Sequence, residues 1–334
     1  MELPKFSFSL PVYNEEKRIG RCLESILSQD YPKEKIEILL VDGGSTDKTR
    51  DIGSKFKCVK ILDNPKKLAD FGVKISMLNA TGDLFVIFAA DNELASKDWL
   101  SSVATLFMED PGLSAVWMRM ICSEDDLPLN RYYTLIQSDP LSFFINKNLD
   151  YYLKYADIKL IYKKNVYIFY VLPERPLIWG ANGLVYRTQK IRDIILQEGF
   201  IADNDVFQTM VESGSNKVAY FQELYIYHHH VKKISDWVKK WERNYLCHFL
   251  TKRQERNLNW IFTKNFKIRL LAWFIYSIIP ICSLFDSIYK SIRYKTPYWL
   301  YHPTVNLVQL FTYIRLTLFS KEGINFIKDV FFKL

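Results

Sequence analysis

Short apolar runs alternate with segments of helical spacing over the first 110 residues. The apolar runs at 6–12, 36–41, 59–62 and 84–89 have the length of buried strands. Apolar residues recur at helical spacing in the segments between and after them, at 19–27, from about 46, at 68–78 and at 97–108. Strands that alternate with helices in this way predict a parallel α/β sheet.

Polar and acidic side chains follow three of these predicted strands. They are Tyr13-Asn14-Glu15, Asp42-Gly43-Gly44 and Asp91-Asn92-Glu93. Ligands of open α/β sheets bind outside the carboxyl ends of the strands, so this edge is the predicted site. We expect Asn14 to cap the helix at 19–27 and Asp47 to start the next helix. The alternative for Asp42 is turn chemistry, in which the run from Asp42 to Asp47 only caps that next helix.

The chain beyond residue 122 is less regular. Residues 123–176 are rich in Tyr, Asn and Leu and show no clean period, so we treat them as an insertion. Regularity returns with a strand at 177–186, helices near 190–196 and 205–213, and strands through 218–228. We therefore expect a catalytic domain at 1–232, a basic amphipathic helical linker at 233–267 and membrane-associated helices at 268–334.

The net charge of +8 is concentrated in one segment. Residues 232–269 hold eleven Lys and Arg against three Asp and Glu, next to an apolar stretch. This arrangement favours a surface of anionic lipid, and no nucleic-acid-binding motif accompanies it. The five scattered cysteines predict neither a zinc site nor a disulfide framework. The start of the chain lacks a signal-peptide pattern, so we expect a catalytic domain in the cytoplasm.

The C-terminal third carries the second apolar signal. Residues 270–285 contain no charged side chain and include Pro280. Sixteen helical residues reach about 24 Å, short of the roughly 30 Å hydrocarbon core. Basic residues on both sides favour a re-entrant hairpin bent at Pro280, with a true span left open. A stripe from Ile324 to Leu334 predicts an interfacial helix. A soluble helical subdomain or a dimer contact is the alternative.

Five short motifs, in order along the chain, resemble those of the family-2 glycosyltransferases. They are Leu10-Pro11-Val12-Tyr13-Asn14-Glu15, Val41-Asp42-Gly43-Gly44-Ser45-Thr46-Asp47, Gly82-Asp83 with Phe88-Ala89-Ala90-Asp91-Asn92, Trp179-Gly180-Ala181-Asn182-Gly183, and Gly199-Phe200 followed by Asp203. The resemblance covers about residues 5–245. It implies the GT-A fold, a Rossmann-like and mostly parallel sheet, here followed by a helical membrane-associated region.

The resemblance assigns the nucleoside of a sugar donor to the first two motifs. Pro11, Tyr13, Glu15 and Asp42 are the implied contacts. A carboxylate at a strand end accepts hydrogen bonds from ribose hydroxyls, as in dinucleotide-binding folds. The second acid usual in this motif is Gly43 here.

The resemblance also implies a divalent metal, Mg²⁺ or Mn²⁺. Asp91 matches the last carboxylate of the family's Asp-x-Asp motif, whose first acid is replaced by Ala89. Oxygen ligands hold such an ion against a departing diphosphate. His228 matches a family position that contacts metal or phosphate; a surface polar cluster with His229 and His230 is the alternative. Asp91 would otherwise cap the helix that follows it.

The family's catalytic base maps to Asp203. An inverting transfer needs a carboxylate to take the proton of the acceptor hydroxyl. The usual preceding Glu is Ala202, and Asp205 competes for the role; both acids would otherwise be helix-start residues. Trp179 and Asn182 resemble the loop that closes over donor sugar and acceptor, with a buried core Trp as the alternative.

The resemblance therefore implies an inverting glycosyltransferase at the cytosolic face of a membrane. It would move a sugar from a nucleotide sugar, a UDP-sugar first, to a lipid-linked or growing glycan acceptor. The alternatives are a polyprenyl-phosphate glycosyltransferase, a nucleotidyltransferase, and a non-catalytic sugar-nucleotide-binding partner. A nucleotidyltransferase should carry a Gly-rich basic loop after its first strand, where this chain has Tyr13-Asn14-Glu15.

Overall fold

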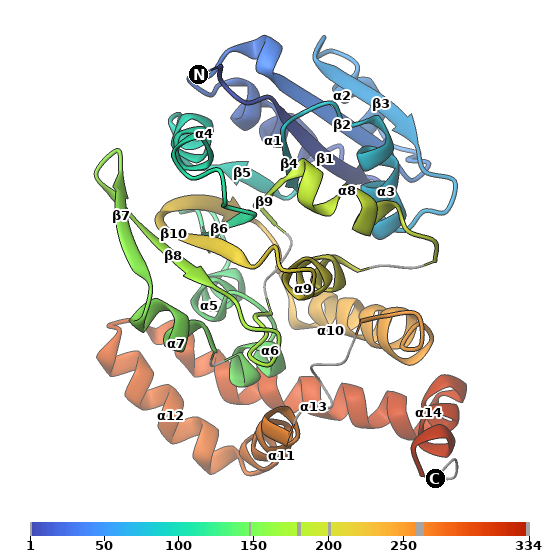
Figure 1. Cartoon of the computed structure of the whole chain (residues 1–334). Coiled ribbons are helices and arrows are strands. Elements are labelled where there is room, and N and C mark those ends of the chain that lie inside the picture. The colour runs from blue at the N-terminus through green and yellow to red at the C-terminus, as the bar shows by residue number, and fades with distance from the viewer. Residues whose placement is uncertain (1, 147, 179–181, 200–201, 258–263, 332–334) are drawn as a thin grey trace. The chain divides into compact units, whose positions relative to one another are not determined.

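The computed structural model describes residues 2–146, 148–178, 182–199, 202–257 and 264–331 of the 334-residue chain (Figure 1). The chain divides into two compact units. The sheet unit comprises Met1–Ile121 and Asn148–His228, and the helical unit comprises Cys122–Lys147 and His229–Leu334. This division differs from the expected boundaries, because 122–147 groups with the C-terminal helices and 148–176 with the sheet.

The sheet unit begins with a parallel α/β half. β1 (Phe6–Val12) lies between β2 (Ile36–Asp42) and β4 (Leu84–Ile87), and β3 (Val59–Asp63) lies outside β2. The pairs are parallel, and Val12 lies opposite Asp42. These strands are the apolar runs that the sequence analysis identified.

Antiparallel strands extend the sheet. β9 (Leu184–Arg187) joins β4 to β6 (Ala115–Ile121), which pairs in parallel with β10 (Lys217–His228). The edge beyond β10 is formed by β8 (Lys164–Tyr170) and β7 (Asp157–Ile161), and the short β5 (Asn92–Leu94) also pairs with β10. The expected α/β fold is confirmed. The parallel arrangement is confined to β3-β2-β1-β4 and β6-β10, and the segment treated as an insertion supplies two strands and α7 (Asn148–Lys154).

Helices cover both faces of the sheet because β-strand side chains alternate between faces. One core contains apolar residues of α1 (Ile19–Leu27) and α4 (Trp99–Glu109). The other contains residues of α3 (Ala69–Asn79), α8 (Thr188–Leu196) and α9 (Asp203–Glu212). The remaining helices of this unit are the short α2 (Thr49–Gly53) and a 3₁₀ turn (Lys33–Lys35).

The expectation that Asn14 caps the first helix is wrong. α1 starts at Ile19, and its N-cap position is Arg18, which makes no side-chain capping hydrogen bond. Asn14 instead has a left-handed backbone, with φ of 55°. Asparagine tolerates this conformation. Its side chain is used in the loop contacts described below.

The helical unit contains seven α-helices among the residues that the structure describes. They are α5 (Pro128–Ile136), α6 (Pro140–Ile145), α10 (Ile234–Arg243), α11 (Lys264–Ile278), α12 (Pro280–Arg293), α13 (His302–Phe319) and α14 (Lys321–Phe331). A π-helical segment (Asn244–Leu250) follows α10, and a 3₁₀ turn (Pro297–Tyr301) precedes α13. Buried hydrogen bonds join distant segments, for example Tyr132 Oη to His302 Nδ1 at 2.6 Å.

Within the described ranges, no single helix has both the length and the apolar composition needed to cross a membrane. Asn265–Ile278 and Pro280–Arg293 meet that test only as a pair, and a 92° bend separates them. The expected bend is thus present immediately before Pro280. The end of the predicted interfacial stripe lies outside the description, because Leu334 and the side chains of Val330 and Phe331 are not described.

Candidate active site

The site lies at the edge of the sheet where β1, β2, β4 and β10 end. β9 runs antiparallel to β4, so it begins at the edge where β4 ends, and the Gly183 N–H donates to the Ile87 carbonyl at 2.9 Å. Asp42, Asp91, Asn182 and His228 therefore all belong to this edge. β2 and β4 flank β1, which separates their ends by two strand spacings, about 10 Å.

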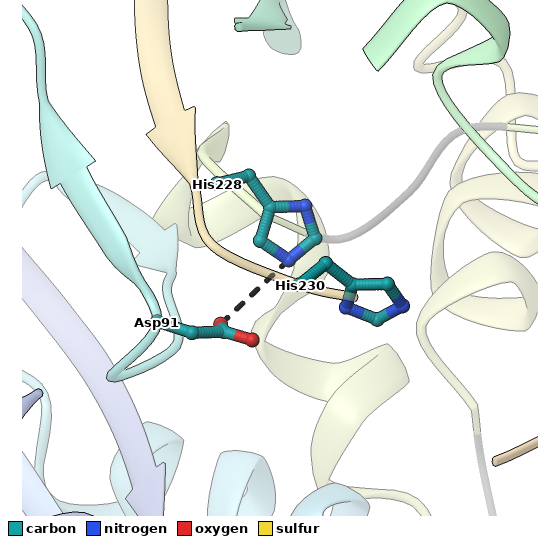
Figure 2. A group of neighbouring side chains, drawn as sticks. All are labelled: Asp91, His228 and His230. Carbon is teal, nitrogen blue, oxygen red and sulfur yellow. Dashed lines mark ion pairs between the residues drawn. The ribbon is translucent and has the colours of Figure 1, made fainter. Parts of the chain in front are cut away.

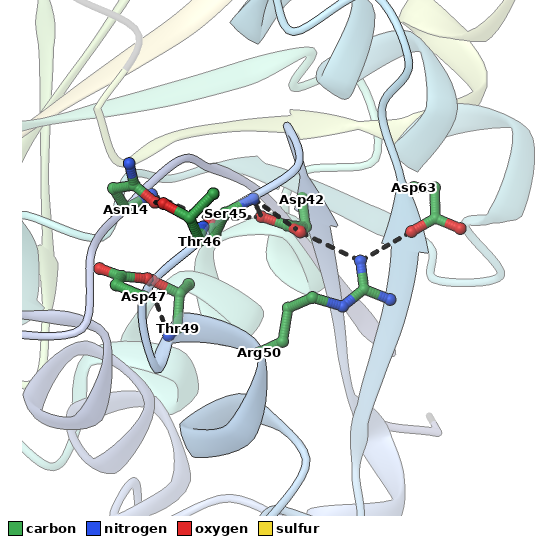
Figure 3. A network of polar contacts seen from close by, with 8 residues as sticks. All are labelled: Asn14, Asp42, Ser45, Thr46, Asp47, Thr49, Arg50 and Asp63. Atoms are coloured by element: carbon green, nitrogen blue, oxygen red, sulfur yellow. Dashed lines mark hydrogen bonds and ion pairs between the residues drawn. The ribbon is translucent and has the colours of Figure 1, made fainter.

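Asp42 is the buried centre of the first part of the site (Figure 3). Its side chain accepts hydrogen bonds from Ser45 N at 3.1 Å, from Ser45 Oγ at 2.5 Å, and from Arg50 Nη1 at 3.0 Å. Burial raises the pKa of Asp42, but the hydrogen bonds from Ser45 and Arg50 outweigh it and leave the pKa below its ordinary value. Asp42 is thus an ionised carboxylate that fixes the loop after β2.

The loop after β1 is tied to the loop after β2. Asn14 Oδ1 accepts from Thr46 N at 2.8 Å, and Asn14 N donates to Ser45 Oγ at 2.9 Å. Asp47 accepts from Thr49 N and from Glu16 N, both at 3.0 Å. Asp47 therefore lies at a helix start, as expected, and also holds the neighbouring loop. We call these two joined loops the cradle.

The other residues expected to hold the nucleoside are Pro11 in β1, and Tyr13 and Glu15 in the cradle. Pro11 packs against α3, where a side chain at Gly72 would come within 2.8 Å of it. Tyr13 is 53% exposed and presents its ring to solvent. Glu15 N donates to Thr49 Oγ1 at 2.7 Å, and its carboxylate lies 3.5 Å from Arg18. Among these, Tyr13 offers the open contact surface.

Asp91 and His228 meet although 137 positions separate them along the chain (Figure 2). Asp91 Oδ1 lies 3.7 Å from His228 Nε2, and their side chains are 12% and 1% exposed. The register of β5 against β10 explains the approach, because Asn92 lies directly opposite His228. At 3.7 Å the pair is too long for a hydrogen bond.

Asn182 completes this group. Its Nδ2 lies 3.1 Å from His228 Nε2. The side-chain amide of Asn92, fully buried beside Asp91, has no hydrogen-bond partner within the described part of the chain. A buried polar group without a partner is costly, so a bound group here would stabilise the site.

The donor set fits a divalent metal. Asp91 and His228 are among the residues whose ligand atoms could hold an ion. Two adjacent ligands of an octahedral ion lie about 3 Å apart, and a small side-chain shift from 3.7 Å reaches that spacing. A carboxylate with an imidazole suits Mn²⁺ better than Mg²⁺, which takes oxygen ligands.

The two candidate bases have different surroundings at the start of α9. Asp205 is 1% exposed, and its Oδ2 accepts from Ala202 N at 3.2 Å. Asp203 is less buried, and its Oδ1 accepts from Asn204 N at 2.7 Å. Burial, and then the charge of Asp203, raise the pKa of the Tyr186 phenol. Asp205 is therefore a helix cap, and Asp203 is the more exposed of the two acids.

Arg50 bridges Asp42 and Asp63 with ion pairs of 3.0 and 2.7 Å and was not among the predicted site residues. Its position eight residues after Asp42, at the start of the next helix, was the available signal. Asp126, whose carboxylate lies 3.0 Å from His229 Nδ1 in the helical unit, was not predicted either. No local pattern predicts that second pair. Trp179 lies outside the described residues.

The sequence also matches a protein-family model over part of its length. The model described as glycosyl transferase family 2 matches residues 7–165, which include the cradle and Asp91. Residues 7–165 belong to glycosyl transferase family 2. The other site residues lie outside the matched segment: Asn182 precedes β9, Asp203 begins α9 and His228 ends β10.

Relatives and solved structures agree with the assignment. A dolichyl N-acetyl-α-D-glucosaminyl phosphate 3-β-D-2,3-diacetamido-2,3-dideoxy-β-D-glucuronosyltransferase of Methanococcus voltae is 38% identical over 120 residues, 33% of this chain and 37% of that protein. Glycosyltransferase GlyA of Streptococcus pneumoniae is 26% identical over 242 residues, 71% of this chain and 32% of that protein. The matches thus span about a third of these relatives.

One solved structure shares the fold. The mannosyltransferase PcManGT from Pyrobaculum calidifontis, in complex with GDP-Man and Mn²⁺, aligns with a TM-score of 0.54 at 16% identity. The alignment covers 94% of this chain and 88% of that one. This similarity supports the GT-A fold of the chain.

Proposed function

We propose that this family-2 chain transfers a sugar from a nucleoside diphosphate sugar to an acceptor hydroxyl, with inversion at the anomeric carbon. The observation that carries the proposal is the convergence of Asp91, Asn182 and His228 at the sheet edge that also holds the Asp42 cradle. A nucleotide bound in the cradle would extend its diphosphate along this edge toward Asp91, over the roughly 10 Å between the ends of β2 and β4.

The cradle would bind the nucleoside. The exposed ring of Tyr13 offers a stacking face for the base, and the Asp42–Arg50 ion pair keeps the loop in the binding conformation. Because Asp42 is saturated by Ser45 and Arg50, its main role in the proposal is to position those groups. A UDP-sugar is expected first; a GDP-sugar is the alternative, since the structural neighbour holds GDP-Man.

Asp91 and His228 would hold Mn²⁺ at the diphosphate. The ion would supply Lewis-acid neutralisation of the charge that develops on the leaving group. His230 follows His228 by two residues, so chain connectivity keeps their Cα atoms within about 7 Å. We therefore include His230 as a candidate third ligand.

Asp203 would remove the proton of the acceptor hydroxyl. A sugar hydroxyl does not ionise near neutrality, so its attack on the anomeric carbon needs a proton acceptor. The Methanococcus relative is named for a dolichyl-phosphate-linked acceptor. A Staphylococcus aureus relative, 32% identical over 110 residues, is named a poly(ribitol-phosphate) transferase. A lipid-linked or growing glycan acceptor is thus proposed.

The test is a screen of nucleotide sugars for thermal stabilisation of the full chain, with Mn²⁺ and with EDTA. At a concentration about a hundredfold above its Kd, a ligand increases the free energy of unfolding by about 2.7 kcal/mol, which raises Tm by several degrees. We expect one nucleotide sugar to raise Tm, and to do so only when Mn²⁺ is present. We also expect slow, metal-dependent hydrolysis of that donor. Hydrolysis-free binding would favour the non-catalytic partner, and a shift with a nucleoside triphosphate and sugar phosphate would favour a nucleotidyltransferase.

A further inference from the structure

The outer side of α12 is apolar along its whole length. Ile281, Leu284, Phe285, Ile288 and Ile292 are 64%, 46%, 69%, 41% and 74% exposed. They recur three and four residues apart, so they form one stripe along the helix. A helix of a water-soluble protein normally turns such a stripe toward the core.

The inner side of α12 is polar. Ser283 and Ser287 are fully buried. Asp286 lies on the same side, where its Oδ2 accepts from Tyr276 Oη at 2.7 Å and from Lys290 Nζ at 2.6 Å. The polarity of α12 is therefore reversed, with polar groups toward the protein and apolar groups outward.

α11 has the same reversed arrangement. Leu271, Ile275 and Ile278 are 62%, 47% and 45% exposed, and their spacing places them on one side. Trp273 and Ser277 are 2% and 1% exposed on the other side. Trp273 Nε1 donates to Asn306 Oδ1 of α13 at 2.9 Å, which fixes the inner side of α11 within the helical unit.

The charges around this surface have one sign. Residues 264–300 contain six Lys and Arg and one acidic residue, Asp286, which is turned inward and paired. Lys267, Arg293 and Lys295 are exposed at the ends of the two helices. Two copies of so basic a surface would repel one another, whereas an anionic surface would attract it.

We propose that the outer sides of α11 and α12 insert into one leaflet of an anionic lipid bilayer, with both helix axes near the membrane plane. The helices have 15 and 14 residues, so each reaches about 22 Å, less than the roughly 30 Å core. Their inner sides are held along both helices by buried contacts, so only the outer stripes are available to lipid. This inference is independent of the proposed reaction.

The first test uses the unmodified full chain and a water-soluble maleimide. Cys282 is exposed on the apolar side of α12, and Cys58 in the sheet unit serves as the internal reference. With vesicles of phosphatidylcholine and phosphatidylglycerol, modification of Cys282 should slow by about tenfold or more, since reaction requires a solvent-accessible thiolate. Cys58 should be unaffected. Unchanged modification of Cys282 in the presence of these vesicles would overturn the inference.

The second test measures flotation with the same vesicles. Phe285→Ser with Ile292→Ser removes two exposed apolar side chains and should weaken vesicle binding by about a hundredfold. Leu78→Ser, at an equally exposed position of α3, is the matched control and should bind like wild type. Pure phosphatidylcholine or high salt should also weaken binding. Equal binding by both variants, or a stable dimer without vesicle binding, would refute the assigned surface.

The third test separates insertion in the membrane plane from a re-entrant hairpin. In a chain whose Cys58, Cys122 and Cys247 are replaced by Ser, a fluorophore is placed at Cys282 or, in a variant that also lacks that thiol, at Ile292→Cys, and is quenched by lipids labelled at two depths. Axes in the membrane plane give equal depths at the two positions. A hairpin that enters through its bend gives a much deeper position for residue 282, and that result would contradict the proposed orientation.

Discussion

Asp205 accepts a hydrogen bond from the backbone N–H of Ala202 at 3.2 Å and is almost fully buried. The Asp205 N–H in turn donates to the Ala202 carbonyl at 3.0 Å. These contacts make Asp205 the capping acid of α9, and they leave Asp203 as the more accessible carboxylate. The two acids should therefore respond differently to substitution.

Asp203→Asn should lower kcat by at least about a hundredfold, the usual loss for a general base. Donor affinity should stay near the wild-type value, because the proposed base does not touch the nucleotide. Steady-state kinetics with the donor found in the screen would measure both. A nearly wild-type rate would indicate either a lipid-phosphate acceptor, which needs no base, or Asp205 as the base.

Asp205→Ala should instead act on stability. Loss of a capping side chain costs about 1 kcal/mol of unfolding free energy, measurable as a lower urea midpoint. The folded fraction should retain most of its turnover. A hundredfold loss of kcat in a fully folded Asp205→Ala protein would assign the base to Asp205.

Asp91→Asn should abolish Mn²⁺-dependent turnover, because it removes the carboxylate ligand next to His228. Circular dichroism should show an unchanged fold. Asp51→Asn, the same change at an exposed position of α2, is the matched control and should keep full activity. Full activity of Asp91→Asn at low Mn²⁺ would remove Asp91 from the site.

His228→Gln should raise the Mn²⁺ concentration required for half-maximal turnover, by about tenfold or more, with a smaller change at saturating metal. A metal titration of the initial rate measures this. An unchanged Mn²⁺ requirement would mean that His228 has only a structural role in β10. Asn182, whose Nδ2 lies 3.1 Å from the His228 ring, would then only support that structure.

Acid should destabilise the cradle through Asp42. Its pKa is lowered in the folded protein, so its contribution to stability is present above the unfolded value near pH 3.9 and is lost as pH falls through the folded pKa. The urea concentration at the unfolding midpoint of the wild type should therefore decrease as the pH is lowered from about 4 to the acid limit of folding. In Asp42→Asn the overall stability should be lower at neutral pH, and this part of the pH dependence should be absent.

A chain that ends near Tyr245 should be poorly soluble. Charge and hydropathy alone predict that removing the apolar tail releases a soluble catalytic domain. The structure shows that Tyr132 bonds to His302, and that Leu141 N donates to Gln309 Oε1 at 2.9 Å, so the truncation removes buried partners of α5 and α6. Expression and gel filtration of the truncated chain test this; a monodisperse, soluble product would contradict it.

Local patterns in the sequence were enough to predict the strands of the parallel half, most of the helices that cover them, and the acids at the strand ends. These features follow from local periodicity and from the order of short motifs, which a single chain displays without knowledge of its folding. The expected Asn14 cap was wrong because the Asn14 side chain accepts a hydrogen bond from Thr46, which lies 32 positions away along the chain.

Which of these groups meet depends on contacts that form only in the folded chain. The pairing of β5 with β10 brings Asp91 to His228, and three paired residues leave almost no periodic signal in the sequence. The burial of Asp205 could not be predicted from the sequence either. The same holds for the outward side of α12, because hydropathy identifies the apolar stripe of a helix but not whether that stripe faces the protein. Such choices depend on contacts between distant segments, and these become fixed only when each unit packs its own core.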